Sequence, residues 1–406
     1  MKSPVETTPA GAIWRDRRAQ ALLLAATLTI MANATISPAL PGLAREFADH
    51  PQVALLTRLL VPAPSLAVVL VAPLVGVLSD RIGRRGLLLW GIALFTLAGS
   101  AGLLLPGLES ILASRLILGV AVAAIMTTQT ALIGDYFSGA ARAALTGLQT
   151  SARNFGGFAF ISSAGLLAGL SPRLPFLIYA LPLLVLPFIL RSLPRPDPRA
   201  ARQGAETLVT DGHPQWRLIL MGLLLFQMIT NMTFFIMPTQ IPFYLDALGH
   251  DGAVMTGTVL GLLTLAGGLA ALAYGHLAAR LGVTGIWALG YGAMAMGMAA
   301  IGVQAGLPAM LAGAVCIGIG FAWVLPAFVT VMLAVAPARR RGTAGGLLTT
   351  SIFLGQVLSP FLSLPIIASI GFDGLYLGAG ALLATISALA LIAGVLQRRR
   401  IRARTV

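Results

Sequence analysis

The stretch Gly76-Val-Leu-Ser-Asp80-Arg81-Ile-Gly83-Arg84-Arg85 stands at the end of a long apolar run. A partial copy of it, Gly275-His-Leu-Ala-Ala-Arg280-Leu-Gly282, ends a second apolar run at an offset of 199 residues. The same offset relates six further pairs of identical residues: Gly91 and Gly290, Gly107 and Gly306, Gly119 and Gly318, Arg142 and Arg341, Gly147 and Gly346, and Gly156 and Gly355. One register shift kept over about 80 residues predicts a chain built from two related halves.

The composition is typical of a membrane protein. Hydrophobic residues make up 57% of the chain and charged residues 10%, and the mean hydropathy is +0.90. A soluble globular chain averages about 25% charged residues, and a soluble chain of 406 residues has too much surface to cover with so few charges. The lipid bilayer is therefore an expected partner of this chain.

The formal net charge is +14, and its placement argues against nucleic-acid binding. All but one of the 27 basic residues are arginine, and nearly all fall in alternate connections between the apolar runs. The other connections hold the acids Glu46, Asp49, Glu109, Asp246, Asp251 and Asp373. This positive-inside bias predicts that both termini are cytoplasmic. No basic cluster is interleaved with aromatic residues that could stack on bases, so nucleic acid is not an expected partner.

Few residues of the chain could carry covalent or metal chemistry. The single cysteine, Cys316, lies in an apolar run, which excludes an internal disulfide and a cysteine-built metal site. The sequence contains no nucleophile–base set, metal cluster or phosphate-binding loop, so neither an enzyme nor a cofactor or metal is expected. The apolar run 19–43 is too long for a signal-peptide core and lacks a clear cleavage site, so it is predicted to be the first membrane helix.

Twelve stretches are long and apolar enough to cross the hydrocarbon, which takes about 20 residues. These stretches are 19–43, 53–78, 87–105, 111–133, 143–169, 174–193, 217–245, 252–279, 285–305, 309–334, 343–370 and 375–396. The exceptionally polar connection 194–216 holds four prolines, which predicts a linker. The predicted organisation is a cytoplasmic N-terminus 1–18, a six-helix bundle 19–193, a cytoplasmic linker 194–216, a second six-helix bundle 217–396 and a basic cytoplasmic tail 397–406.

The twelve spans in two sets of six, the central linker and the motif Gly76–Arg85 resemble the major facilitator superfamily over essentially the whole chain. The resemblance implies an all-α membrane protein whose two six-helix bundles are related by pseudo-two-fold symmetry. It also implies a monomeric carrier that moves a small solute by alternating access, in a bacterial-type inner membrane. The alternative from another class is a non-transporting membrane receptor or assembly partner.

In the family that the chain resembles, the motif after the second span holds the outward-facing state. The resemblance implies that Asp80 ties the second helix to the start of the eleventh, with help from Arg84 and from the acid at the end of the fourth span, Asp135. The residues assigned to this gate are Gly76, Asp80, Arg81, Gly83, Arg84, Arg85, Asp135 and Arg142. Ala279 replaces the aspartate in the second half, so no equivalent latch is expected there. The alternative is an ordinary positive-inside loop.

Three charged residues lie within the predicted spans, and all are arginines of the first half: Arg58, Arg115 and Arg153. An arginine at membrane depth is costly and usually faces a water-filled cavity, so each is a candidate substrate contact. Arg58 is near a helix end and could instead snorkel to the surface. Arg115, which also matches a family motif of an arginine four residues before a glycine, and Arg153, near the midplane, could instead be structural arginines.

Seven uncharged residues complete the candidate cavity, on spans that line or flank the cavity in this family: Asn33, Gln129, Gln149, Gln227, Asn231, Trp323 and Gln356. A single buried Asn or Gln is as often a helix–helix hydrogen bond as a ligand contact. Their clustering beside two arginines with no buried acid is what favours a binding site.

This imbalance of charge predicts the substrate class. Guanidinium groups pair with carboxylate or phosphate, which favours an anionic or zwitterionic solute such as a carboxylate metabolite, a siderophore or an acidic drug. Efflux is favoured over uptake, because expelling one negative charge from a cell that is negative inside by about 100 mV gains roughly 2.3 kcal/mol. The alternative is a polyspecific drug:proton antiporter with structural arginines, since Gly346, Gly355 and Ser359-Pro360 resemble the antiporter pattern. Protons are a candidate coupling ion, carried by the substrate or by Asp135 or Glu109. The alternative is a carrier that runs on the solute gradient and the membrane potential.

Overall fold

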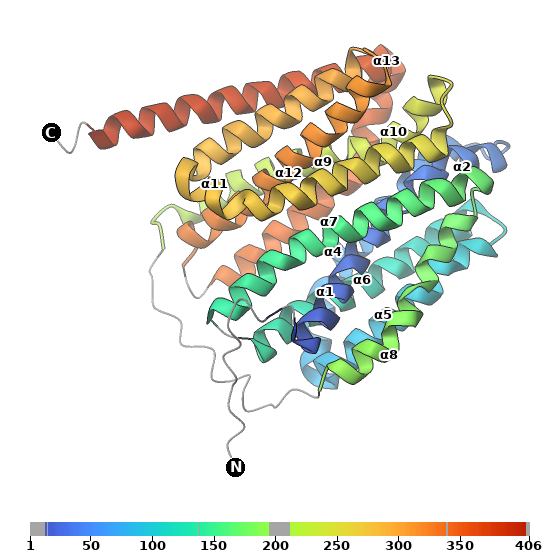
Figure 1. Cartoon of the computed structure of the whole chain (residues 1–406), viewed down its shortest axis with the longest axis horizontal. Coiled ribbons are helices and arrows are strands. Elements are labelled where there is room, and N and C mark those ends of the chain that lie inside the picture. Colours follow the sequence, from blue (N-terminus) through green and yellow to red (C-terminus); the bar gives the residue numbers. More distant parts are fainter. Residues whose placement is uncertain (1–12, 14, 138, 195–211, 338–339, 403–406) are drawn as a thin grey trace. The chain divides into compact units, whose positions relative to one another are not determined.

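The computed structural model describes residues 13, 15–137, 139–194, 212–337 and 340–402. These residues are helical or lie in short connections, and none of them is in a strand. Contacts between residues divide the chain into two compact units, Met1–Thr207 and Leu208–Val406 (Figure 1). Residues 195–211, most of the predicted linker, lie outside the described part.

The first unit holds six helical spans, three of which are broken. The elements are α1 (Arg17–Ala34), η2 (Ser37–Ala39), α2 (Leu40–Glu46), α3 (Val53–Leu59), α4 (Ala63–Ile82), α5 (Arg84–Ser100), η3 (Ala101–Leu103), α6 (Leu108–Tyr136), α7 (Gly139–Leu170), η4 (Leu174–Ala180) and α8 (Pro182–Ser192). Prolines cause the breaks, because proline has no N–H to offer the preceding turn. Pro62 and Pro64 stand where α3 and α4 meet at an angle of 54°.

The second unit has five longer elements: α9 (Trp216–Phe234), α10 (Ile236–Ala247), α11 (Gly252–Gly302), α12 (Leu307–Val335) and α13 (Arg341–Arg402). α11 and α13 are each interrupted by one residue with positive φ, Gly282 at 68° and Gly371 at 75°. The chain reverses its direction at both glycines (Figure 1), so each of the two elements contains two spans. The two returning halves pack on each other, and Ser387 Oγ donates to the carbonyl of Ala288 at 2.6 Å.

The helices are consistent with the twelve predicted spans. In the described part, eight helices are long and apolar enough to cross a membrane, and the bent α3–α4 pair makes a ninth. The interrupted α11 and α13 are two of the eight and each covers two predicted stretches. α7, with 32 residues, is long enough to cross but more polar. The last helix continues six residues beyond the predicted end at Leu396, to Arg402.

The 199-residue repeat of the sequence is a repeat of helix crossings. A Cβ at Gly119 of α6 would lie under 3.0 Å from the carbonyl oxygen of Pro64 in α4. A Cβ at Gly318 of α12 would lie under 3.0 Å from the carbonyl oxygen of Leu263 in α11, and both partners differ by the same offset. The glycines are therefore repeated because two helix backbones touch at each of these points.

The glycines of the motif also have a shared backbone role. Gly83 ends α4 with a φ of 91°, and its counterpart Gly282 has a φ of 68°. Residues with a Cβ rarely adopt these angles, because the Cβ would collide with the neighbouring carbonyl. Both glycines thus allow the tight reversal that joins the second and third spans of each unit.

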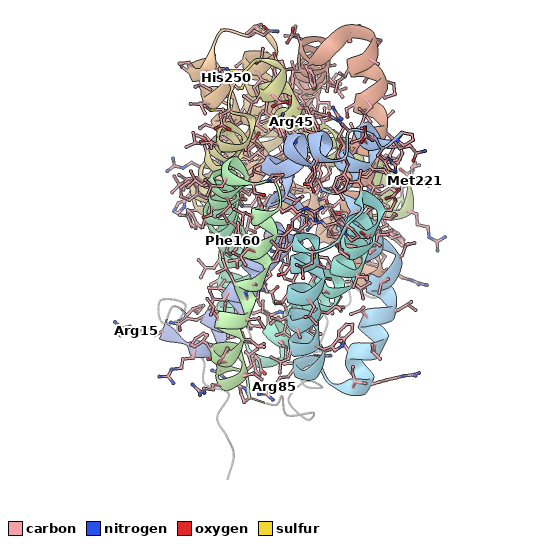
Figure 2. The ribbon with its side chains drawn as sticks, turned by 90° about the vertical axis from the view of Figure 1, so that its right-hand side faces the viewer. Arg15, Arg45, Arg85, Phe160, Met221 and His250 are labelled. Atoms are coloured by element: carbon pink, nitrogen blue, oxygen red, sulfur yellow. The ribbon has the colours of Figure 1, made fainter. Side chains whose placement is uncertain are left out.

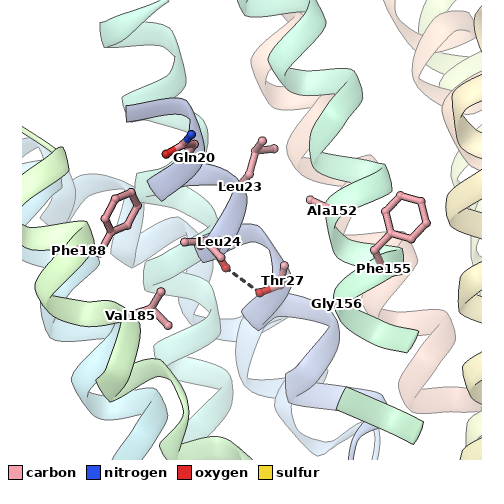
Figure 3. A pocket seen from close by; sticks show the side chains of 9 residues that line it. All are labelled: Gln20, Leu23, Leu24, Thr27, Ala152, Phe155, Gly156, Val185 and Phe188. Carbon is pink, nitrogen blue, oxygen red and sulfur yellow. Dashed lines mark hydrogen bonds between the residues drawn. The ribbon is translucent and has the colours of Figure 1, made fainter. Parts of the chain in front are cut away.

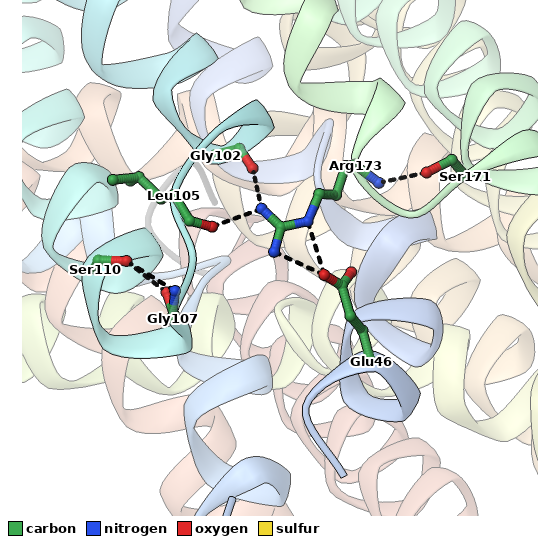
Figure 4. A network of polar contacts seen from close by, with 7 residues as sticks. All are labelled: Glu46, Gly102, Leu105, Gly107, Ser110, Ser171 and Arg173. Carbon is green, nitrogen blue, oxygen red and sulfur yellow. Dashed lines mark hydrogen bonds and ion pairs between the residues drawn. The ribbon is translucent and has the colours of Figure 1, made fainter. Parts of the chain in front are cut away.

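At the end of the first unit where α2 finishes, Arg173 joins three segments (Figure 4). Its Nε donates to Glu46 at 2.8 Å, and its Nη1 donates to the carbonyls of Gly102 and Leu105 at 3.0 and 2.6 Å. These bonds fix the ends of the first and third spans to the connection that enters the sixth. This contact could not be predicted from the sequence, because the partners of Arg173 lie 68 to 127 residues away.

The second unit makes the corresponding contact with the opposite charge. Asp373 accepts hydrogen bonds from the hydroxyl of Tyr244, at the end of the seventh span, and from the side chain of Gln304, after the ninth. Gln304 is offset by 199 residues from Leu105, and Asp373 by 200 from Arg173. The two halves therefore use the same architecture with an arginine at the centre of one cluster and a carboxylate at the centre of the other.

Candidate binding site in the first unit

Two polar side chains on α7, Gln149 and Arg153, carry buried donors with no partner in the described structure. The Nε2 of Gln149 and the Nε of Arg153 each lie out of contact with solvent and make no hydrogen bond. The residues are one helical turn apart, so they share a face of α7. Arg153 lies ten residues into the predicted span, about 15 Å along the helix and near the middle of a 30 Å hydrocarbon.

Unpaired donors at this depth are energetically costly. A buried donor without a partner costs about 1–3 kcal/mol, and more if it is charged. No aspartate or glutamate lies well inside any predicted span, so the chain supplies no obvious counter-charge at this depth. A bound anion would satisfy both donors at once, which makes this turn of α7 the strongest candidate for a substrate contact.

Arg115 differs from this expectation. It is fully buried in α6, and its Nε donates to the carbonyl of Leu60 at 3.1 Å. Its Nη2 donates to the carbonyl of Ala32, at the end of α1, and its guanidinium lies 5.1 Å from the ring centre of Tyr179. Leu60 needs such a donor because Pro64, four residues later, has no N–H. These contacts favour the structural alternative for Arg115, although its Nη1 has no partner.

We expect Arg115→Met to destabilise the protein more than it changes the affinity for substrate. The substitution removes two charge-assisted hydrogen bonds and leaves the carbonyl of Leu60 without a donor, at a cost of about 3 kcal/mol or more. The measurement is the midpoint of thermal unfolding of the purified protein, together with the KM of the surviving protein in liposomes. The exposed Arg280→Met is the matched control and should leave the midpoint unchanged. A normal midpoint with a raised KM in Arg115→Met would return this arginine to the substrate site.

The other polar candidates of the first unit make hydrogen bonds within the protein, two of them between helices. Gln129 Nε2 donates to the carbonyl of Leu22 in α1, and Asn33 Nδ2 donates to Ser65 Oγ at 3.0 Å. Arg58 Nη1 donates to the carbonyl of Ala54, one turn earlier in the same helix, at 2.9 Å. The Oε1 of Gln129 remains unpaired, so this amide is only half satisfied.

The second unit has its own buried polar cluster on α9. Neither end of the Gln227 amide has a partner, and the Oδ1 of Asn231 is also unpaired. Asn231 Nδ2 donates to the backbone carbonyl of Gln227 at 3.0 Å. Gln356 is buried in α13 beside Gly355, where a Cβ would lie 3.1 Å from the Cβ of Asn231. The Gln227 amide therefore offers both a donor and an acceptor, whereas the Nε1 of Trp323 already donates to the carbonyl of Ala270 at 3.0 Å.

At the other end of the first unit, the motif residues make contacts with neighbouring spans. Arg84 pairs with Asp135 at the end of α6, and Arg85 Nη2 donates to the carbonyl of Leu190 in α8 at 2.7 Å. Arg81 and Arg142 are exposed. The side chain of Asp80 lies outside the described part, so its predicted contact with the eleventh span stays a prediction. The Oδ2 of Asp135 is buried without a partner.

Comparison with known proteins decides the family. The sequence matches the family model of the Major Facilitator Superfamily over residues 22–360 and, in a second match, over 253–405. The chain belongs to the major facilitator superfamily. Members of this superfamily are transporters rather than enzymes, and the chain is a multi-pass membrane protein of that kind.

Individual relatives in the superfamily are named for different compounds. The class C tetracycline resistance protein of Escherichia coli is 32% identical over 154 residues, which span 38% of this chain and 39% of that protein. A crystal structure of a D-xylose–proton symporter has a TM-score of 0.72 and 19% identity, over 91% of this chain and 96% of its own. A crystal structure of a human organic anion transporter has a TM-score of 0.66 and 19% identity, over 92% and 99%. The two structures show a shared fold only.

In this superfamily member the ion pair between Arg84 and Asp135 leads to a direct test. We expect Asp135→Asn and Arg84→Gln each to slow transport several-fold, and their double variant to lose little more, because both remove the same contact. Residues in contact show a coupling free energy of about 0.5–3 kcal/mol. The flux of the double variant should therefore differ at least twofold from the product of the two single effects. The measurement is a double-mutant cycle on initial flux. Arg85 bonds to a backbone carbonyl and not to Asp135. The effects of Arg85→Gln and Asp135→Asn on flux should therefore be independent, so that the double variant shows their product. Independent effects in both cycles would contradict a functional pair.

Proposed function

We propose that this chain exports an organic anion or zwitterion across the plasma membrane by alternating access. The observation that carries the proposal is the turn of α7 on which Gln149 and Arg153 hold unpaired buried donors. A carboxylate accepts hydrogen bonds from a guanidinium and an amide together, and such charge-assisted bonds are the strong ones in a site of low polarity. In the proposed orientation both termini are cytoplasmic, and the site lies near mid-membrane.

Export is the proposed direction for an energetic reason. With the interior negative by about 100 mV, each net negative charge that leaves gains roughly 2.3 kcal/mol. The partial similarity to a tetracycline resistance protein is in keeping with export, although that relative covers only part of this chain. Proton coupling would use the substrate itself or a carboxylate at the periphery of the spans, such as Asp135 or Glu109.

A second candidate is a polyspecific drug:proton antiporter. Two observations favour it: the tetracycline resistance protein as a relative, and Arg115, whose contacts are those of a structural arginine. In this reading Arg153 would also be structural, and the buried, unpaired Oδ2 of Asp135 would mark the proton-carrying group. The two candidates therefore differ in the charge of the substrate and in what drives its flux.

The deciding experiment is solute flux in proteoliposomes, with membrane potential and pH gradient imposed separately. The panel contains monocarboxylates, dicarboxylates, zwitterions and cationic drugs. Flux of anions that follows the potential supports the anion exporter. Flux of cations that follows the pH gradient and is unchanged in Arg153→Ala would replace it with the antiporter.

A further inference from the structure

An apolar groove of about 600 Å³ runs between α1, α7 and α8 of the first unit (Figure 3). Leu23 and Leu24 of α1, Phe155 of α7, and Val185 and Phe188 of α8 form most of its wall. Leu24 and Phe155 remain 39% and 37% exposed, so the bundle does not fill this space. Apolar surface of this kind on a membrane protein is normally covered by lipid chains or by another helix.

A second hollow of about 490 Å³ adjoins the groove at the end of the bundle. Arg17, at the start of α1, and Arg191, near the end of α8, line it together with Ser192. Phe188 lines both hollows, so they share a wall. Figure 2 shows the labelled Arg15 and Arg85 toward this same end of the first unit.

Arg17 and Arg191 differ from the neighbouring Arg18 in their ion pairs. Arg18 forms an ion pair with Asp16 at 2.8 Å, and burial of Asp16 is outweighed by its bonds to Arg18, so the pKa of this carboxyl is lowered. In the described part of the chain, no ion pair involves Arg17 or Arg191. Two uncompensated guanidinium groups and a hydroxyl beside an apolar groove fit an anionic head group with an apolar tail.

The dimensions agree with this chemistry. From Arg17 to Thr27, where the groove ends on α1, ten residues rise about 15 Å. That length equals about half of a 30 Å hydrocarbon, which is the depth of one leaflet. The polar hollow lies at the helix ends and the apolar groove lies deeper, in the order of a phospholipid.

We propose that the first unit binds an anionic glycerophospholipid, with its phosphate at Arg17, Arg191 and Ser192 and one acyl chain in the groove between α1, α7 and α8. The charge asymmetry of the sequence places this site in the cytoplasmic leaflet. Ala152 and Gly156, which line the groove, flank Arg153 in the chain, so the lipid would contact the turn of α7 that carries the candidate substrate site. The lipid site does not depend on the proposed substrate.

Native mass spectrometry of the purified full-length protein tests the site, with phosphatidylglycerol and phosphatidylcholine as the probes. We expect phosphatidylglycerol to bind more tightly, and Arg17→Gln/Arg191→Gln to weaken it on the order of tenfold or more, since each arginine near an anionic surface contributes about a factor of five. Arg217→Gln/Arg280→Gln removes the same charge from two exposed positions elsewhere and should leave binding unchanged. Both double variants change exposed side chains only, so folding is not at risk.

A second variant tests the apolar half of the site. Ala152→Phe fills the groove without changing charge, and it should weaken phosphatidylglycerol while leaving the unfolding midpoint near that of the parent protein. Equal binding of the two lipids, or equal loss in the two double variants, would overturn the proposal. Full competition by millimolar inorganic phosphate, or unchanged lipid binding in Ala152→Phe, would reduce the site to a simple anion site and overturn the assignment of a lipid.

Discussion

Arg153→Ala is expected to reduce the flux of organic anions at least 30-fold while the protein remains folded in the membrane. Removing one partner of a buried charged hydrogen bond costs about 2–5 kcal/mol, which corresponds to a factor of about 30 to several thousand. The Nε lost in this variant makes no hydrogen bond within the described protein, so its removal leaves no acceptor of the protein without its donor. The measurement is initial flux in proteoliposomes at a fixed membrane potential, with the amount of inserted protein determined in parallel.

The pattern among variants separates a binding role from a structural one. Arg153→Lys keeps the charge but loses the planar fork, so it should recover only part of the flux. Gln149→Leu, which removes the neighbouring donor, should raise KM for the same solutes. Arg280→Gln, at an exposed position of the second unit, is the control for loss of one positive charge, and its flux should stay within about threefold of the parent. Normal anion flux in folded Arg153→Ala would remove the basis for an anion site on α7.

The contrast between Arg115 and Arg153 shows how far the sequence predicts the candidate site. Hydropathy alone identifies both as charged residues in apolar spans, but it cannot say which of them has partners. The carbonyls that bind Arg115 belong to Leu60 and Ala32, 55 and 83 residues away, and they are free only where helices end or where a proline follows. Such contacts depend on how broken helices pack, which a single sequence does not specify.

The fold was more accessible to prediction than the site. Periodicity, length and charge are local properties, so the spans and the family could be read from the chain, and the comparisons confirm the family and the all-α fold. The gaps are contacts between distant residues. Arg173 stands in a short connection with no acid close to it in the sequence, and only the structure shows that it bonds to the ends of two other spans.

Gly119→Ala is expected to lower the free energy of unfolding by about 3 kcal/mol. We expect no other glycine-to-alanine substitution in the first unit to be more destabilising. The added Cβ would lie under 3.0 Å from the carbonyl oxygen and the Cα of Pro64. Backbone atoms cannot rotate away as a side chain can, so α4 and α6 must separate, and overpacking of this kind costs about 1–3 kcal/mol or more. The measurement is the midpoint of thermal unfolding in detergent, followed by fluorescence-detected size exclusion.

The repeat supplies both a replicate and a control for this prediction. Gly318→Ala places its Cβ against the carbonyl of Leu263 in the second unit, so it should be destabilising to a similar extent. Gly147→Ala adds the same methyl group in α7, where nothing lies within 4 Å, and alanine favours a helix over glycine by about 1 kcal/mol. Gly147→Ala should therefore melt at or above the parent temperature. If Gly119→Ala and Gly318→Ala also melted there, the close crossings of α4 with α6 and of α11 with α12 could not be the reason why glycine recurs at the 199-residue offset.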